Sequence, residues 1–587
     1  MPRDLIPAFL NVEASLTGRR WIGMDEGTTR AAAQLAQLRD LSDPVARLLA
    51  SRGVAADEVD AFLAPTMRAL MPDPSSLMDM DKAVEIFCRH VRSRGRIAIF
   101  ADYDVDGGAS AALLIDWLRA MGREATLYIP DRIDEGYGPN VPAMERLAEG
   151  HDLIVCVDCG TLSFEPIAAA KACGVDVIVL DHHQGGETLP AADAVVNPNR
   201  QDEVSEHTYL CAAGVVFLML AGANRAMRGE GGVPDLMSLL DLVALATVAD
   251  VAPLVGFNRA LVRQGLSVMA RRERPGLVAL GEVAGINARP SSYHLGFLLG
   301  PRVNAGGRIG AADLGARLLA TRDPAEASAL AERLDHLNRE RREIEAEVLA
   351  QARRQVEERG ADGPLVWAAD EGWHPGVVGI VAARLKDAFN RPAVVIGIAD
   401  GQGKGSARSV AGVDLGGAVA AATREGILLK GGGHAMAAGL TVAADRLEPA
   451  MARLSELLAR QGAGDMGPAD LRVTGLIAAR AATVDLIEQL DACGPFGAGA
   501  PQPRFALANQ RIAFAKRAGE SHLRLTVAAQ DGGRIDAIAF RAYETEIGPA
   551  LEAHAGRPVH VAGKLEIDEW GGRRKPKLKI DDVAFAG

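Results

Sequence analysis

The stretch Asp102-Tyr103-Asp104-Val105-Asp106-Gly107-Gly108 follows directly on the apolar run Ile97-Ala98-Ile99-Phe100. An apolar run that ends in acids and glycines predicts a buried strand that ends at the edge of a sheet, where α/β folds bind their ligands. Residues two apart in an extended chain share a face, so we expect Asp102, Asp104 and Asp106 to converge. Three anions in one pocket need cations to offset their repulsion. The alternative is a surface turn, because Asp and Gly both favour turns.

The same pattern recurs further along the chain. Apolar runs lead into metal-binding residue types at three more places: at Asp158, at Asp181-His182-His183 and at Asp250. Carboxylates and imidazoles without a thiolate partner suit hard or borderline divalent ions such as Mg²⁺ and Mn²⁺. The sequence therefore predicts a metal site built from segments that lie far apart in the chain.

Four motifs in this order, DYDVDGG, VDCG, DHH and TVADV, resemble the DHH phosphoesterase superfamily. Within it, the chain is most similar to the RecJ family of single-strand-specific 5′→3′ exonucleases. The segments that carry this closer resemblance lie at 131–138, 300–308, 337–342, 405–409 and 432–434. One motif alone has little specificity, whereas the ordered set, from about Trp21 to the C-terminus, is very specific.

The resemblance implies two bound divalent ions, Mn²⁺ or Mg²⁺. Asp158 is expected to bridge them and His182 to be a terminal ligand, while Asp181 and His183 orient neighbours or handle protons. Two such ions activate a water molecule and neutralise the phosphodiester. The implied metal ligands are Asp102, Asp104, Asp106, Asp158, His182 and Asp250, and the implied catalytic residues are Asp158, His182, His183 and His434.

The resemblance also implies contacts with the substrate. Ser406 and Arg408 are expected to hold the 5′-terminal phosphate from a flexible turn, because a guanidinium binds phosphate through two hydrogen bonds. One or both of Arg302 and Arg308 are expected to join them. The full predicted set of substrate contacts is Arg132, Tyr137, Arg302, Asn304, Arg308, Ser406, Arg408, Gly432, Gly433 and His434.

The order of apolar segments predicts an α/β fold. Strands are expected at 96–101, 125–130, 153–158, 176–181 and 194–197, in a parallel sheet of βαβ units. A long helix from Asp323-Pro324 to about Arg359 is typical of a connector. A second α/β unit begins near Leu365, with glycine-rich turns around Gly403–Ser406 and Gly431–Gly433.

Short strands with Gly-Gly turns follow to the C-terminus, where the resemblance implies an OB-fold β-barrel. The N-terminal residues look helical, and we expect them to pack on the domain that follows them. The predicted domains are residues 1–95 (helical extension), 96–322 (DHH catalytic domain), 323–360 (connector helix), 361–462 (DHH-associated substrate-binding domain) and 468–587 (OB-fold, single-strand-binding domain).

The formal net charge of −12 over 587 residues counts against DNA binding as a property of the whole surface. Local basic clusters must therefore supply it. Bases stacked on aromatic rings beside a basic groove are the usual way to hold single strands. The candidate contacts form two groups: Lys516, Arg517 and Arg524, and then Arg573, Arg574 and Lys575 near Trp570. The alternative is an ordinary solvated hairpin.

Other classes of function find no support in the sequence. We expect no signal peptide or membrane segment, and hence a cytoplasmic protein. Cys156 and Cys159 form a CxxC pair without a second pair at zinc-finger spacing, and the nucleotide-binding pattern GxxxxGK[ST] is absent. We expect a monomer that binds single-stranded DNA. A single-strand-binding protein and a helicase are its candidate protein partners.

The prediction is a metal-dependent exonuclease that degrades single-stranded DNA from its 5′ end, in DNA repair and recombination. One alternative is a DHH phosphodiesterase of short oligonucleotides or cyclic dinucleotides, which would have both catalytic domains without the C-terminal module. The other is a non-catalytic DNA-binding scaffold, which the intact set of acids argues against.

Overall fold

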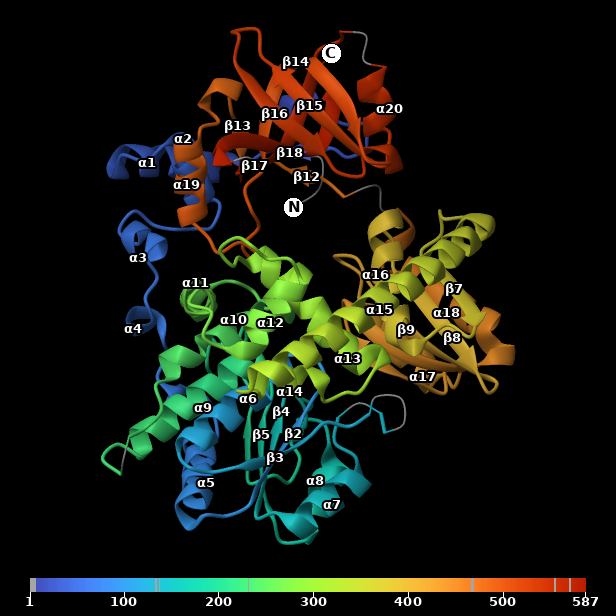
Figure 1. The fold of residues 1–587 in the computed structure, drawn as a ribbon. Coiled ribbons are helices and arrows are strands. Elements are labelled where there is room, and N and C mark those ends of the chain that lie inside the picture. Colours follow the sequence, from blue (N-terminus) through green and yellow to red (C-terminus); the bar gives the residue numbers. More distant parts are fainter. Residues whose placement is uncertain are drawn as a thin grey trace.

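A computed structural model describes residues 7–131, 135–136, 138–230, 232–465, 469–553, 556–569 and 572–586. Arg132 and Tyr137, two of the predicted substrate contacts, lie outside these residues, as does Trp570. Figure 1 shows a first α/β domain, a second domain to its side and a barrel above both. Within the described ranges, no helix combines the length and the apolar character that crossing a bilayer requires.

The first domain is built on a five-stranded sheet in the order β3-β2-β4-β5-β6, and every pair is parallel. Ile97 and Ile99 face one apolar core, and Ala98 and Phe100 face another, because helices cover both sides of the sheet. The predicted strands are confirmed, each to within two residues. They are β2 (Ile97–Ala101), β3 (Ala125–Tyr128), β4 (Leu153–Val157), β5 (Asp176–Leu180) and β6 (Ala194–Val196).

Helices complete the domain and carry the chain away from the sheet. The helices α6, α9 and α10 pack on one another over one face, and α7 and α8 cover the other. Their bounds, with those of the helices that follow, are α6 (Val105–Ala120), α7 (Val141–Gly150), α8 (Phe164–Ala172), α9 (Ala212–Ala226), α10 (Leu240–Ala249), α11 (Gly256–Met269), α12 (Pro275–Val283), the π-helix η5 (His294–Leu299), α13 (Gly300–Ile309) and α14 (Leu314–Ala320).

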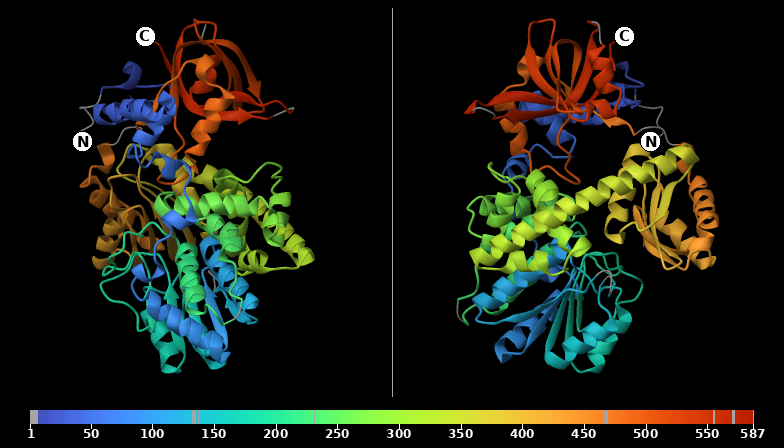
Figure 2. Two further views of the ribbon diagram at one scale, coloured as in Figure 1. Left: turned by 90° about the vertical axis from the view of Figure 1, so that its left-hand side faces the viewer. Right: turned by 45° about the vertical axis from the view of Figure 1, so that its right-hand side comes forward.

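The predicted connector is one helix, α15 (Pro324–Arg359), which runs from the first domain to the second (Figure 2). It begins where the side chain of Asp323 accepts a hydrogen bond from the backbone of Ala325, and it ends at Gly360. Because a single rigid helix joins them, it sets the spacing between the two domains.

The second domain has a five-stranded mixed sheet in the order β10-β11-β9-β8-β7. Only the pair β7–β8 is parallel. Its strands and helices are β7 (Val366–Glu371), β8 (Ala393–Ala399), β9 (Gln402–Arg408), β10 (Lys430–His434), β11 (Ala437–Ala443), α16 (Pro375–Phe389), α17 (Leu415–Arg424) and α18 (Leu447–Ala459).

The expectation of glycine-rich turns at 403–406 and 431–433 was wrong, because both segments are strands of this sheet, β9 and β10. Gly403 and Gly405 allow close packing within the sheet rather than a turn. A Cβ atom on Gly403 would lie 2.7 Å from Cγ2 of Ile396, and one on Gly405 would lie 2.9 Å from Cγ1 of the same residue. Glycine in a strand often marks such a close approach, which interpretation as a turn overlooks.

The C-terminal part forms a six-stranded sheet in the order β13-β14-β15-β16-β18-β17, which the additional pairing of β14 with β17 closes into a barrel. This confirms the predicted β-barrel. Its elements are β13 (Gly475–Leu476), β14 (Phe505–Ala518), β15 (His522–Ala528), β16 (Arg534–Ala539), β17 (Val559–Asp568), β18 (Lys575–Phe585), α19 (Val484–Ala492) and α20 (Ile547–Glu552).

We expected the N-terminal helices to pack on the domain that follows them, but not all of them do. Leu35, Leu49 and Val59 lie in one core with residues of the barrel, and Trp21 pairs in parallel with Leu471. Figure 1 shows these blue helices beside the red barrel. Of the remainder, α4 packs on α11 and α5 packs on α9, both in the first domain. The elements are β1 (Trp21–Ile22), α1 (Glu26–Arg39), α2 (Asp43–Ala50), α3 (Val59–Leu63), α4 (Met67–Leu70), α5 (Met80–Ser93) and β12 (Leu471–Arg472).

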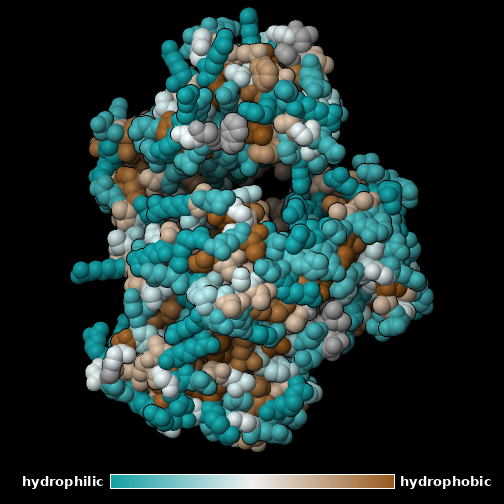
Figure 3. Space-filling view, in the orientation of Figure 1, coloured by the Kyte–Doolittle hydropathy of each residue, from teal (hydrophilic) through white to brown (hydrophobic). Residues whose placement is uncertain are grey.

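An arginine of α11 joins the N-terminal helices, the first domain and the segment that leads into the barrel. Arg259 of α11 donates hydrogen bonds to the carbonyl oxygens of Phe62, Cys493 and Gly494, at 2.9–3.1 Å. Its guanidinium carbon also lies 3.7 Å from the centre of the Phe62 ring. This junction holds the barrel over the first domain, and Figure 3 shows the surface hollowed between them.

Candidate active site

The motif at 102–108 turns from strand to helix sooner than the sequence suggested. Strand β2 ends at Ala101 and α6 begins at Val105, so the expected extended path through Asp106 was wrong. Asp104 is the N-cap of α6, and its side chain accepts hydrogen bonds from the backbone of Asp106 and Gly107. Gly107 is needed because a Cβ atom there would lie 2.4 Å from the carbonyl oxygen of Asp102.

Helices bring two further acids to this edge. Asp106 is buried, and its carboxylate accepts hydrogen bonds from the backbone nitrogens of Ala212 and Ala213 at the start of α9. The positive end of that helix therefore faces a carboxylate. Asp250 is the C-cap of α10, and it reaches this edge because α10 packs on α6.

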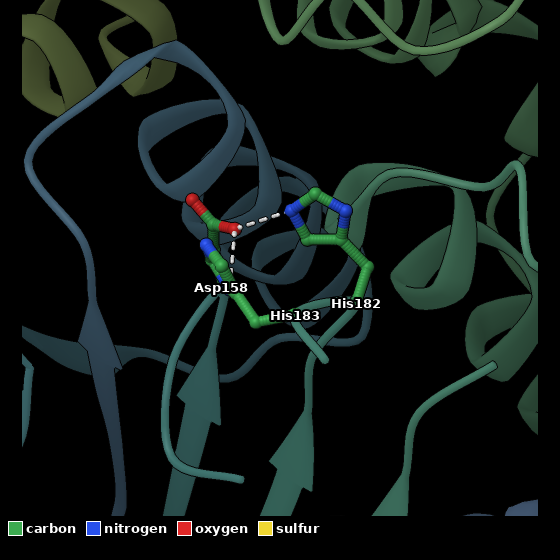
Figure 4. A group of neighbouring side chains, drawn as sticks. All are labelled: Asp158, His182 and His183. Carbon is green, nitrogen blue, oxygen red and sulfur yellow. Dashed lines mark ion pairs between the residues drawn. The ribbon is translucent and has the colours of Figure 1, made fainter. Parts of the chain in front are cut away.

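The acids and histidines fall into three overlapping groups. In each group, ligand atoms of three residues lie within 4.8 Å of one another. Figure 4 shows His182 and His183, which follow β5, directed toward Asp158, which follows β4. The groups are Asp158, His182 and His183; Asp106, His182 and Asp250; and Asp102, Asp104 and Asp158.

His182 lies at the centre of the cluster. Its Nε2 atom is 3.2 Å from Oδ1 of Asp158 and 3.6 Å from Oδ2 of Asp106, and its Nδ1 atom is 3.8 Å from Oδ2 of Asp250. Nε2 of His182 and Oδ1 of Asp158 are both buried without a hydrogen bond. Buried polar atoms are normally bonded, so this pair fits a site where a cation sits between its ligands.

The electrostatics of the cluster lead to the same conclusion. Burial, followed by the charge of Asp106, raises the pKa of Asp158 well above its usual range. Burial and the same neighbour raise the pKa of Asp250 to about 9. Carboxyl groups held this close resist ionisation unless a positive charge joins them. Oxygen and imidazole donors without thiolate suit Mn²⁺ and Mg²⁺, so the residues present fit the implied ions.

Asp181 stands apart from the other acids because it is well supplied with donors. It accepts hydrogen bonds from the backbone of Thr161 and His182, and from Nδ1 of His183 at 2.8 Å. Burial opposes ionisation, but these bonds and the charge of His183 outweigh it and lower the pKa of Asp181. Burial likewise opposes protonation of His183, but the bond and charge of Asp181 raise its pKa to about 9.

Two asparagines that sequence reasoning missed hold the histidines in place. The side chain of Asn197 donates to the carbonyl oxygen of His183 at 2.7 Å, and that of Asn199 donates to the carbonyl oxygen of His182 at 2.6 Å. Both follow β6, at the same edge of the sheet as the acids. The rule that located Asp158 and His182, polar residues directly after a buried strand, could have found Asn197 as well.

The second domain carries a pocket of about 380 Å³. Lys404, Ser406 and Arg408 alternate along β9, so their side chains share one face of the sheet. Nη1 of Arg408 donates to Oγ of Ser406 at 3.0 Å. The pocket is also lined by Pro375 and Gly376, so the N-terminus of α16 opens on it. A helix N-terminus with cationic side chains is a common anion site.

The structure separates Arg302 from Arg308. Arg308 lines the pocket, where its Nη1 atom donates to the carbonyl oxygen of Gly376 at 3.0 Å. Arg302 is instead paired with Asp335 of α15, with Nε 2.9 Å from Oδ1. Asn304 accepts a hydrogen bond from the backbone of Val105, next to the acids of the first motif. Lys404, which the sequence reasoning did not include, is a further cation at the pocket.

His434 faces the metal-binding edge from the second domain. A cavity of about 680 Å³ is lined by Asp181 and His183 on one side and by exposed His434 on the other. Gly433 lines the smaller pocket beside Arg408, so β10 lies between the two spaces. The fold thus brings His434 to the histidines of the first domain, although about 250 residues separate them in the sequence.

On the barrel, strand pairing gathers cations from three strands. Lys516 of β14 pairs with Arg524 of β15. Arg524 also pairs with Ile538 of β16, and Ile538 pairs with Lys579 of β18. We call Lys516, Arg524 and Lys579 the basic row. Sequence reasoning missed two aromatic rings beside this row. Phe514, two residues from Lys516, is 52% exposed, and Phe540, two residues from Ile538, is 48% exposed. Nζ of Lys579 is 5.2 Å from the centre of the Phe540 ring.

The other predicted barrel cations lie elsewhere. Arg517 donates to the carbonyl oxygen of Glu520 and stacks over the ring of Tyr543. Arg574 is paired with Glu488 and Glu569. Arg573 and Lys575 are exposed near the β17–β18 connection. Of the six, the structure brings only Lys516 and Arg524 together in the basic row.

Comparison with known proteins assigns three parts of the chain to domain families. Residues 96–247 match the DHH family N-terminal domain, residues 362–460 the DHHA1 domain, and residues 473–582 the RecJ OB domain. The single-stranded-DNA-specific exonuclease RecJ of Dickeya dadantii is 39% identical over 92% of this chain and 95% of its own length. The protein of that name in Escherichia coli is 37% identical over the same shares.

Solved structures agree with these matches. The crystal structure of RecJ from Thermus thermophilus in complex with Mn²⁺ superposes with a TM-score of 0.80 at 29% identity, covering 96% of this chain and 79% of that one. The same protein in complex with Mg²⁺ gives a TM-score of 0.74 at 27% identity over 96% and 78% of the two chains.

Proposed function

The chain belongs to the RecJ family of single-stranded-DNA-specific exonucleases, and from this premise we propose that it removes nucleotides from the 5′ end of unpaired DNA. It is a hydrolase of phosphodiester bonds that uses Mn²⁺ or Mg²⁺. The single observation that carries the proposal is the pocket formed by Arg308, Ser406 and Arg408 across a cavity from the acid and histidine cluster. A 5′-phosphate in that pocket would leave the first phosphodiester near the cluster.

We propose that the cluster holds two divalent ions through the predicted ligand residues. When bound, such ions neutralise the phosphate and lower the pKa of an attacking water molecule. The buried, unbonded atoms of Asp158 and His182 support this assignment. The proposed ligands are Asp102, Asp104, Asp106, Asp158, His182 and Asp250.

His183 is proposed to handle a proton. Its Nδ1 atom is held by Asp181, and its raised pKa of about 9 favours the protonated ring near neutral pH. The ring lines the cavity, so its Nε2 atom can donate to the leaving 3′-oxygen. His434, on the opposite wall, is proposed to contact the phosphate of the same nucleotide.

Digestion of labelled strands tests the function as a whole. We expect a 5′-phosphorylated single strand to lose mononucleotides from its 5′ end in Mn²⁺ or Mg²⁺, and no cleavage once a chelator is added. The matching duplex should resist, because we propose that the space between the phosphate pocket and the acid and histidine cluster admits one strand. Release from the 3′ end first, or equal digestion of the duplex, would contradict the proposal.

We propose that the basic row on the barrel binds the strand beyond the active site. Cations beside exposed aromatic rings hold a single strand without regard to sequence. The logarithm of the affinity falls as the logarithm of the salt concentration rises. Replacing Lys516, Arg524 and Lys579 with Gln should make this slope shallower by about two for a long strand. Cleavage of strands too short to reach the barrel should not change.

Arg517→Gln is the matched control for this prediction, because Arg517 lies on the same strand as Lys516 but is turned toward Glu520. Its salt dependence should equal that of the unmodified protein. If the triple variant also keeps the original slope, the strand does not cross this face. Salt titrations of binding, monitored by fluorescence anisotropy, provide the measurement.

The biological setting follows from the substrate. We propose that the enzyme acts in the cytoplasm on cellular DNA, in repair and recombination, where 5′-ended strands must be removed. Because it would not accept a duplex, a helicase would supply the unpaired strand and a single-strand-binding protein would keep it open. A phosphodiesterase of dinucleotides would have no use for the barrel, which supports the longer substrate.

A further inference from the structure

A cavity of about 930 Å³ lies in the first domain, away from the metal-binding edge. It is larger than the two spaces at the active site, which measure about 680 and 380 Å³. Residues of α11, α12 and η5 line it, and it reaches α6 at Asp116 and α10 at Asp241. Among the described residues that line it, none is a proposed metal ligand or phosphate contact.

Two packed helices run from this cavity to the metal site. Asp116 lies ten residues after Asp106 on α6, which is about 15 Å along the helix axis. Asp241 is in the first turn of α10, and Asp250 is the C-cap of the same helix. The cavity therefore lies at the opposite ends of these helices from two of the proposed metal ligands, and a ligand in it would not occupy the place of the substrate.

One wall of the cavity holds an arginine between two buried acids. Nη1 of Arg274 donates to Oδ2 of Asp116 at 2.6 Å, and Nε of Arg274 donates to Oδ2 of Asp241 at 2.8 Å. Asp116 is 6% exposed, and its other oxygen, Oδ1, is buried without a hydrogen bond. Nη2 of Arg322 is 3.5 Å from that oxygen. Because buried polar atoms are normally bonded, Oδ1 is an acceptor that a ligand in the cavity could use.

Gly281 of α12 keeps the cavity open. It is buried, yet a Cβ atom there would meet no described atom within 4 Å. Gly276 of the same helix differs, because its Cβ atom would lie 1.9 Å from the carbonyl oxygen of Leu318. Glycine inside a helix is destabilising relative to alanine. Packing among the described residues requires that cost at Gly276 but not at Gly281, which fits a wall that must leave room for a ligand.

The other lining residues indicate the chemistry of this ligand. Arg289 lines the cavity and is exposed, and within the described part of the chain it makes no hydrogen bond or ion pair. A guanidinium in this position suits a phosphate. Apolar side chains between Arg289 and the acids suit a flat, largely apolar ring system. They include Val268, Met269, Leu277, Val278, Ile286 and Leu299.

At Asp116 the cavity presents an acceptor beside a donor, namely Oδ1 of Asp116 and the guanidinium of Arg322. The pairing edge of a nucleobase presents the complementary arrangement, a donor beside an acceptor. In adenine these are the amino group and the neighbouring ring nitrogen. A nucleotide therefore combines the three features that the cavity requires, which are a polar edge, a flat ring and a phosphate.

We propose that this cavity is a regulatory site for a nucleoside 5′-phosphate. The base lies between the apolar walls with its pairing edge at Asp116 and Arg322, and the phosphate faces Arg289. The site goes beyond the proposed exonuclease function and is separate from the active site. The ligand bears on α6 and α10, which carry Asp106 and Asp250 at their other ends, so its binding alters the rate of cleavage.

Titration calorimetry with a chelator present tests the binding without metal at the active site. We expect dAMP to bind, and the deoxynucleotide of unsubstituted purine, which lacks only the amino group, to bind roughly 10- to 150-fold more weakly. Equal affinity of the two would overturn the contact with Asp116. ATP in a parallel titration distinguishes the sources of the ligand: tighter binding of ATP than of dAMP identifies a cellular triphosphate, and the reverse identifies the product of digestion.

Two substitutions of one residue separate filling the cavity from changing its helix. Gly281→Leu places a side chain in the open space and should weaken the binding of dAMP at least about tenfold. Gly281→Ala adds one carbon atom, so it should retain the binding and raise the melting temperature. Arg408→Ala, in the second domain, tests the other phosphate pocket. Loss of dAMP binding in Arg408→Ala but not in Gly281→Leu would place the nucleotide in the active site and overturn the proposal.

The phosphate contact has its own matched pair of variants. Arg289→Gln should weaken the binding of dAMP about tenfold, because it removes a charged donor. Arg271→Gln is the control, since Arg271 is exposed close to the cavity without lining it, and its affinity for dAMP should equal that of the unmodified protein. Equal affinities of the two variants would exclude Arg289 from the phosphate contact.

Cleavage kinetics test the regulatory role. A nucleotide at the active site competes with the strand and raises KM alone, whereas one in the cavity changes kcat. We expect dAMP to change kcat of the unmodified protein but not that of Gly281→Leu. If the unmodified protein cleaves strands and dAMP changes only KM, the regulatory role is wrong and the exonuclease stands. If no strand is cleaved, the proposed exonuclease function fails, and the titrations still decide whether the cavity binds a nucleotide.

Discussion

Replacing Asp158 with asparagine is expected to lower the rate of strand cleavage by at least about 10³-fold, because one neutral ligand in place of a shared carboxylate removes charge from the centre of the site. Asp158 belongs to two of the three potential metal-binding groups. Asparagine is a better replacement than alanine here, since Asp158 has φ +59°, a backbone conformation that Asn and Asp tolerate. Single-turnover cleavage in saturating Mn²⁺ gives the rate.

The same variant should be more stable than the unmodified protein when a chelator is present. Burial raises the pKa of Asp158 in the folded protein. This carboxyl therefore lowers the stability of the folded state at every pH above the pKa that Asp158 has in the unfolded chain. The asparagine side chain would carry no charge to bury, and the melting temperature of Asp158→Asn should be higher under those conditions. Added Mn²⁺ should reverse the order, because it stabilises the protein that keeps the carboxylate.

Asp152→Asn is the matched control for Asp158→Asn, since Asp152 directly precedes β4 at the opposite edge of the sheet and is exposed. It should keep full activity. Substantial cleavage by Asp158→Asn in saturating metal would remove Asp158 from the ligand set. A melting temperature below that of the unmodified protein in chelator would mean that the carboxylate is stabilised by the fold itself.

Replacing Arg408 with alanine should remove the preference for 5′-phosphorylated ends. A hydrogen bond to a charged group contributes about 1.5–3 kcal/mol, so kcat/KM on a 5′-phosphorylated strand should fall roughly 10- to 150-fold. The same strand with a 5′-hydroxyl should be cut at an unchanged rate, because it offers the guanidinium no terminal phosphate. Parallel digestion of the two strands gives the ratio.

Arg302→Gln is the control for Arg408→Ala, because Arg302 is committed to Asp335 and lies outside the pocket. Its ratio of phosphorylated to hydroxyl ends should match that of the unmodified protein. Arg408→Lys should fall between, as it keeps the charge and loses the paired donors. An unchanged preference in Arg408→Ala would exclude Arg408 from the 5′-phosphate contact.

The sequence was a good guide wherever periodicity and position in the chain settle the structure. The parallel strands of the first domain and the connector helix were expected, because a buried strand and a long amphipathic helix each have a characteristic pattern. Short strands were also expected in the C-terminal part, and the family resemblance implied that they form a barrel. The family resemblance was confirmed by the comparisons. Glycine was misleading at β9, since close packing and a turn both require it.

Pairings between distant segments could not be predicted. Nothing local shows that α1 to α3 pack on the barrel rather than on the next domain, because an amphipathic helix specifies an apolar partner without identifying it. The separation of Arg302 from Arg308 depends on which face of α13 meets α15. Phe514 and Phe540 join the basic row only through strand register.

By itself the sequence determined which chemical groups the protein can use, because strand ends carry acids and histidines whatever the remainder of the chain does. Only the tertiary structure decided which of them meet. Asp158, His182 and Asp250 come from segments up to 92 residues apart, and Arg408 reaches the site across the connector helix. The physical reason is that covalent spacing fixes local direction, whereas distances between elements are set by packing.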